Sequence, residues 1–146
     1  VQRFQTVRLY AEQYALLVAP GHPFADRKHV SWADAGRLPL CLLTGDMQNR
    51  RIIDRHLADA GVEIPPMLES NSMTMLHVHV RSGLFATIAA VGTGERFAAP
   101  MELIAIPIVE PAVTHEIGLV LKAREPHPPH VSAFLTMARK FAPPSV

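Results

Sequence analysis

The sequence contains a single cysteine, Cys41, and this scarcity excludes a disulfide within the chain. A lone thiol inside an apolar segment is typical of proteins kept in a reducing compartment. No nucleophile motif surrounds Cys41, so a cysteine–histidine catalytic pair, the one enzyme hypothesis that the composition suggests, has little support. We expect Cys41 to be a structural thiol in the core.

An excess of charge of one sign is lacking as well. The 14 lysines and arginines nearly balance the 13 aspartates and glutamates, and the formal net charge is +1. DNA-binding domains neutralise phosphates with a clear surplus of basic groups on one surface. We therefore do not expect this polypeptide itself to contact DNA bases.

Long apolar runs are absent too, since no stretch approaches the roughly 20 residues that a membrane-spanning helix needs. The first twelve residues lack the apolar core of a signal peptide. These two absences predict no membrane association and no leader within the printed sequence.

Metal-binding and catalytic patterns are also lacking. His77 and His79 would share a face only on a strand, and no third ligand lies at a suitable spacing from them. The segment from Gly92 to Gly94 is too short for a phosphate-binding loop. We expect no metal, no cofactor and no catalytic residues, and hence no enzyme.

The most informative stretch that is present runs from Pro39 to Ala60. The apolar letters PLCLLT predict a strand covered on both faces, and Thr44, Gly45 and Asp46 supply turn residues, with Asp46 expected as the helix N-cap. The helix that follows is expected to end at Gly61. Its apolar stripe is expected to consist of Ile52, Ile53, Leu57 and Ala60. Its charged outer face is expected to consist of Arg50, Arg51, Asp54, Arg55 and Asp59.

A helix that starts directly after a buried strand directs free N–H groups and its positive dipole end above the sheet. Most such turns bind nothing, so a structural turn without a ligand is the alternative to a binding role on this pattern. The strand–turn–helix pattern predicts a hole of the size of a small anion above the sheet.

Further elements follow from periodicity and turn residues. The region 7–19 predicts a hairpin or two short strands, and Ser31 predicts the cap of a short helix that Trp32 anchors in the core. The strand–helix–strand–helix–strand order from residue 39 to residue 91 implies a parallel sheet with right-handed crossovers. The other expected elements are strands near 67–71, 85–91, 103–109 and 117–121, a loop or short helix at 92–100, and an amphipathic helix over 129–141 whose apolar stripe is Val131, Phe134, Leu135 and Ala138.

The segment from Ser72 to Gly83 stays open on pattern alone. Leu76, Val78 and Val80 alternate with polar residues, which indicates a strand. A serine that can cap and a glycine that can terminate favour a helix instead.

Four stretches together resemble the effector-binding domain of LysR-type transcriptional regulators. They span nearly the whole chain, and their order and spacing carry the resemblance more than any single motif. They are LLVAPGHPFA, LPLCLLTGDMQNRRIIDRHLADAG, ESNSMTMLHVHVRSGLFATIAA, and the closing IPIVEP with HEIGLVLKAREPHPP and AFLTMARKF.

The resemblance implies an α/β fold of Rossmann-like subdomains, similar to type II periplasmic binding proteins, with a small ligand in the cleft between them. It implies that subdomain II is complete over 18–108, and that 1–17 and 109–146 belong to a partial subdomain I. It also favours the helix for Ser72 to Ser82. The winged helix-turn-helix, the linker helix and the first half of subdomain I would then precede Val1.

By the same resemblance, we expect a ligand-sensing domain of a cytoplasmic bacterial regulator. It would act as a homodimer or tetramer and would reach promoter DNA only through the N-terminal reader. A solute-binding domain of a transport system is the alternative, since it shares the fold and the cleft.

The expected effector site lies at two helix starts that follow neighbouring strands. Hydroxyls, amides and free N–H groups without a basic side chain suit a small carboxylate or another oxyanion. The predicted residues are Thr44, Asp46, Met47, Gln48 and Asn49 at one helix start and Asn71, Ser72 and Met73 at the other.

Overall fold

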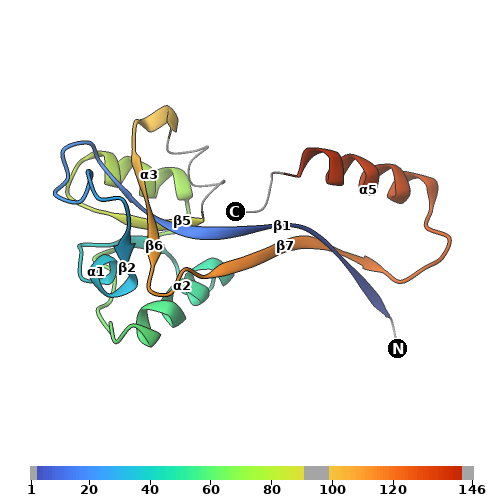
Figure 1. The fold of residues 1–146 in the computed structure, drawn as a ribbon, viewed down its shortest axis with the longest axis horizontal. Coiled ribbons are helices and arrows are strands. Elements are labelled where there is room, and N and C mark those ends of the chain that lie inside the picture. The colour runs from blue at the N-terminus through green and yellow to red at the C-terminus, as the bar shows by residue number, and fades with distance from the viewer. Residues whose placement is uncertain (1–2, 91–98, 143–146) are drawn as a thin grey trace. The chain divides into compact units, whose positions relative to one another are not determined.

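The structure, a computed structural model, describes residues 3–90 and 99–142. Contacts divide the chain into two compact units. Unit 2 is the continuous segment Gln13–Val113, and unit 1 combines residues 1–12 with residues 114–146. The strand β1 (Phe4–Val18) contributes to both units, as Figure 1 shows. The helices and strands confirm the expected α/β class.

Unit 2 is built on strands that pair in the order β2-β6-β1-β5, and a parallel bridge from Leu40 to Ala86 sets β3 beside β5. The strand β4 pairs with β3 on the other side. Besides β1, these strands are β2 (Val30–Ser31), β3 (Cys41–Leu43), β4 (Leu68–Ser70), β5 (Thr87–Ala90) and β6 (Ile104–Val109).

The length and the direction of β1 each correct an expectation. It is one strand of 15 residues and not a hairpin. It also pairs antiparallel with both β5 and β6, so the sheet is mixed and not wholly parallel. The expected parallel order holds for β3 with β4, and for β3 with β5 at the Leu40–Ala86 bridge.

Three helices cover the two faces of this sheet: α1 (Trp32–Gly36), α2 (Gln48–Asp59) and α3 (Met73–Arg81) (Figure 1). Leu40 and Leu42 belong to a core cluster with Ile53 and Leu57 of α2, whereas Cys41 and Leu43 belong to a second cluster with residues of α3. Successive strand side chains point to opposite faces. The helices α2 and α3 therefore lie on opposite faces of β3.

The ends of these helices follow local chemistry. The Ser31 side chain accepts a hydrogen bond from Asp34 N at the start of α1, and Trp32 is buried as expected. The Ser72 side chain accepts from Met75 N, which confirms the helix for this segment. Gly61 and Gly83 follow α2 and α3 with positive φ, a conformation that costs glycine little.

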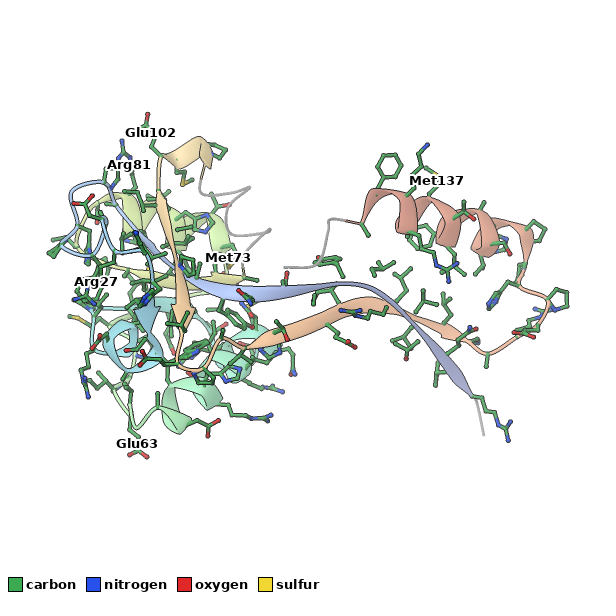
Figure 2. All side chains as sticks on the ribbon, viewed as in Figure 1. Arg27, Glu63, Met73, Arg81, Glu102 and Met137 are labelled. Atoms are coloured by element: carbon green, nitrogen blue, oxygen red, sulfur yellow. The ribbon has the colours of Figure 1, made fainter. Side chains whose placement is uncertain are left out.

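Unit 1 pairs the first half of β1 with β7 (Thr114–Lys122), and Arg8 lies 3.0 Å from Glu116 across the pair. The expected closing helix is α5 (Pro129–Phe141). Its buried side is centred on Leu135, whereas Phe134, expected in the apolar stripe, is 55% exposed. Met137 also points away from the helix into solvent (Figure 2).

Two expectations concern regions that are only partly described. A loop or short helix is expected at 92–100, but residues 91–98 lie outside the described residues. The described end of this region is a short 3-10 turn, η1 (Ala99–Met101), which precedes β6. Over the described ranges, no helix is long and apolar enough to cross a membrane.

Gly36 at the end of α1 generates a stability prediction. A Cβ placed there would lie 2.7 Å from Leu57 Cδ2 and 2.8 Å from Val62 Cγ1. We expect Gly36→Ala to lower the free energy of unfolding by about 1–3 kcal/mol, because this core must shift to admit a methyl group. Chemical denaturation monitored by circular dichroism measures the change.

Gly45→Ala is the matched control, because a Cβ there would meet nothing within 4 Å. Its effect should stay within about 0.5 kcal/mol. Equal losses in the two variants would contradict the packing argument.

Candidate functional site

Two turns leave the sheet at the same edge. The strands β3 and β4 are parallel neighbours, with Leu43 opposite Ser70, so the residues that follow each strand begin side by side at their carboxyl ends. Tyr14 of β1 pairs with Ala90, the last residue of β5, at this edge as well. We call this region the carboxyl edge. Crevices at such edges are where open α/β sheets bind ligands.

The first turn connects β3 to α2, and here one expectation is wrong. The N-cap of α2 is Met47 and not Asp46, and no side chain caps the helix. The Asp46 carboxylate instead accepts a hydrogen bond from the Thr44 hydroxyl, which is the main reason that its pKa lies below the usual value. Backbone N–H groups at the start of α2 therefore lack a side-chain acceptor, as an anion-binding helix terminus requires.

Arg51 of α2 donates hydrogen bonds back to the backbone of the β3–α2 connection. Its Nε lies 3.2 Å from Gly45 O, and its Nη2 lies 3.1 Å from Asp46 O. The guanidinium also contributes to the lowered pKa of Asp46. The negative charge of Asp46 is thus offset locally by a cation, which reduces its repulsion of an approaching anion.

The second turn connects β4 to α3. Ser72 Oγ accepts from Met75 N at 3.4 Å, so the cap uses an oxygen lone pair and leaves the hydroxyl proton able to donate elsewhere. Ser72 N donates to Ser70 Oγ at 3.1 Å, which fixes the backbone before the helix. Asn71 is exposed between these residues.

The eight predicted residues are distributed on both sides of the carboxyl edge. Met47 and Met73, one from each turn, pack against the same core cluster, and the side chain of Met73 can be followed in Figure 2. Gln48 is exposed, and the half-buried Asn49 accepts a hydrogen bond at Oδ1 from Tyr14. The turns share an edge, but α2 and α3 begin on opposite faces of it, so the two groups flank the edge and do not form one row.

The sequence pattern assigns Arg50 to the outer face of α2, and this assignment is wrong. The residue is 8% exposed. Its guanidinium donates to Leu43 O at 2.6 Å, to Glu69 Oε1 at 2.5 Å and to Asp54 Oδ1 at 2.8 Å. Burial opposes its charge, but the two carboxylates outweigh burial and raise the pKa of Arg50. It ties together β3, β4 and α2 directly beneath the predicted site.

A signal for Arg50 is present in the sequence. Arg50, Ile53 and Leu57 are spaced three and four residues apart, so the arginine lies on the buried stripe of α2. Its charge favours the exposed assignment, and its partner Glu69, 19 residues away, is not visible from helical periodicity.

The one cysteine of the chain lies in the core, at the start of β3. Cys41 is fully buried with its Sγ 3.6 Å from Leu76 O, and burial raises the pKa of its thiol to about 11. Within the ranges 3–90 and 99–142, no group of three or more histidine, cysteine, aspartate or glutamate side chains could hold a metal ion.

Arg50 gives the first prediction of this site. We expect Arg50→Met to lower the free energy of unfolding by about 1–3 kcal/mol, because Leu43 O loses a buried donor and two carboxylates lose their shared cation. Urea denaturation measures the loss. Arg55→Met is the control on the exposed side of the same helix and should change stability by less than about 0.5 kcal/mol. A comparable loss in both variants would show that Arg50 is not a special tether.

Cys41 gives the second prediction. At pH 8 a thiol with a pKa of about 11 is about one part in a thousand thiolate, the reactive form, and this one is also buried. We expect a thiol reagent such as 5,5′-dithiobis(2-nitrobenzoic acid) to label the native chain only slowly, and to label it at once in 6 M guanidinium chloride. Since the chain has one cysteine, absorbance at 412 nm reports this residue alone. Immediate full labelling under native conditions would contradict the burial.

Comparison with known proteins identifies the family. The family model described as the LysR substrate binding domain matches residues 1–143. A probable nitrogen assimilation transcriptional activator of Synechococcus elongatus is 24% identical over 132 residues, which cover 90% of this chain and 43% of that protein. The chain thus spans less than half the length of this relative.

Solved structures agree on the fold. The effector binding domain of QuiR in complex with shikimate gives a TM-score of 0.77 at 17% identity, covering 95% of this chain and 65% of that one. The Synechocystis PCC6803 CcmR regulatory domain in complex with 2-PG gives a TM-score of 0.78 at 13% identity, covering 98% and 70% respectively. LysR effector-binding domains have the type II periplasmic binding protein-like fold, and they are ligand-binding domains of transcription regulators, not enzymes. The chain belongs to the LysR substrate-binding domain family.

Proposed function

We propose that this chain senses a small anion, such as a carboxylate, at the carboxyl edge of unit 2, and that binding controls transcription through an N-terminal winged helix-turn-helix. The observation that carries the proposal is the pair of helix starts that follow the adjacent parallel strands β3 and β4. One of them, at Met47, has no side-chain cap.

The chemistry of the edge supports an oxygen-rich anion. Backbone N–H groups at the start of α2 and the hydroxyl proton of Ser72 are donors, whereas the Thr44 hydroxyl already donates to Asp46 and is left with its acceptor lone pairs. A ligand that carries both a carboxylate and hydroxyl groups would satisfy both kinds of group. Shikimate, which is bound in the QuiR complex, has this composition, and it supports the class of ligand without identifying it.

The proposed mechanism is a shift between populations. A ligand that binds two arrangements of the regulator with different affinity changes the proportion of each and thereby changes how the attached DNA readers engage the promoter. We propose that the regulator works in the cytoplasm as a homo-oligomer, since promoters with two-fold symmetry are contacted by symmetric assemblies. The match to a regulator family favours this role over solute transport.

A functional prediction follows for the two hydroxyl residues, Thr44 and Ser72. In a regulator that carries this chain, we expect Thr44→Ala or Ser72→Ala to raise the inducer concentration at half response by up to about tenfold, because one lost hydrogen bond costs about 0.5–1.5 kcal/mol. Promoter affinity without inducer should stay nearly unchanged. A promoter–reporter titration measures the first quantity, and a gel-shift assay measures the second.

Thr136→Ala is the matched control, because it removes an exposed hydroxyl of α5 in unit 1. It should leave both quantities unchanged. Unaltered inducer midpoints in the Thr44 and Ser72 variants would refute the site. Loss of promoter binding with no change in the inducer response would assign these hydroxyls to folding instead.

A further inference from the structure

Tyr14 is a buried tyrosine whose ring is fixed by other aromatic rings. Its side chain is 4% exposed, and its ring centroid lies 5.7 Å from that of Trp32 at an interplanar angle of 66°. The His56 ring of α2 lies 6.3 Å from Tyr14 and 4.8 Å from Trp32. Edge-to-face packing of this kind restricts the ring to one orientation. The phenol oxygen therefore has a defined position.

From this position the hydroxyl reaches the first turn of α2. Tyr14 Oη donates to Asn49 Oδ1 at 2.7 Å. Asparagine carries one carbonyl oxygen and one NH₂ group with two donors. Because the tyrosine engages the oxygen, the NH₂ is the part of the Asn49 carboxamide whose hydrogen-bonding capacity stays wholly available to a ligand. Asn49 therefore presents hydrogen-bond donors, which suit a carboxylate, phosphate or hydroxyl oxygen.

We propose that Tyr14 is a positioning residue of the anion site, holding the Asn49 carboxamide by its oxygen so that the amide N–H groups face the ligand. This inference rests on the proposed function and assigns to Asn49 a specific role in it, the selection of ligands that accept hydrogen bonds. Tyr14 itself does not touch the ligand.

The location of Tyr14 gives this contact a second consequence. Tyr14 is the second residue of unit 2 on β1, directly after the point where that strand enters from unit 1. Its packing partner Trp32 donates from Nε1 to Pro111 O at 3.1 Å, close to the other end of unit 2. The aromatic cluster therefore joins the ligand-facing turn to both segments through which unit 2 connects to unit 1. A shift of Asn49 on binding would act directly on β1.

Isothermal titration calorimetry on the chain tests the proposal, with shikimate and 2-PG as probes. For the probe that binds the unsubstituted chain, Tyr14→Phe should weaken binding by about three- to tenfold, because the carboxamide loses the bond that orients it. Tyr10→Phe, the same change four residues earlier on the same strand, should alter binding by less than about twofold. Asn49→Asp, which replaces the donors by an acceptor and still accepts from Tyr14, should weaken binding more than about tenfold.

A double-mutant cycle separates positioning from general support of the fold. If Tyr14 acts through Asn49, then Tyr14→Phe should weaken binding in the unsubstituted chain and add nothing in the Asn49→Ala background. An equal loss in both backgrounds, or no loss in either, would overturn the positioning role. Failure of both probes to bind the unsubstituted chain would overturn the anion site and this inference together. Weaker binding on Thr44→Ala or Ser72→Ala with a silent Tyr14→Phe would leave the site standing and remove only the role of Tyr14.

Discussion

Burial of β3 on both faces is the constraint on which the rest of unit 2 depends. Its side chains are at most 7% exposed, and they alternate between two core clusters. An apolar strand of this kind must have a helix on each face. Right-handed crossovers meet this need, because α2 leads from β3 to β4, whereas α3 leads back past β3 to β5. The connections β3–α2–β4 and β4–α3–β5 run in opposite directions across the sheet. If both are right-handed, α2 and α3 must therefore lie on opposite faces.

The same reversal creates the candidate site. Where adjacent parallel strands send their helices to opposite faces, the two helix starts diverge, and open α/β sheets bind their ligands at such points. Arg50 stabilises this arrangement from below by donating to the end of β3 and to Glu69 of β4. The strand ends are thus held together while the helix starts diverge. The site needs this combination, since a ligand requires both room and fixed donors.

Much of this arrangement could be predicted from local sequence. Ser31, Ser72 and Gly61 have the expected roles at helix ends, because capping depends on residues within one turn. The helix α3 is ambiguous by periodicity, and its end residues together with the family resemblance favour it correctly. The positions of the predicted ligand residues are now known, but their contact with a ligand remains a prediction.

The errors share a physical cause, which is competition from partners and packing that the local pattern does not contain. Asp46 would be an ordinary N-cap, but the Thr44 hydroxyl and Arg51 hold its turn differently. The pattern over 7–19 suggests a hairpin or two short strands, yet β1 continues through this region because it passes there from one unit to the other and pairs with strands of both.

The carboxyl edge also explains how a local binding event could affect the rest of the chain. The strand β1 enters unit 2 at this edge, where Tyr14 pairs with the end of β5. The strand β6 runs antiparallel to β1 and ends at the same edge, shortly before Pro111. At this edge the first turn of α2, which carries Asn49, is one hydrogen bond away from β1, the strand that both units share. A two-state switch requires an element whose equilibrium the ligand biases, and in the proposed mechanism that element is β1.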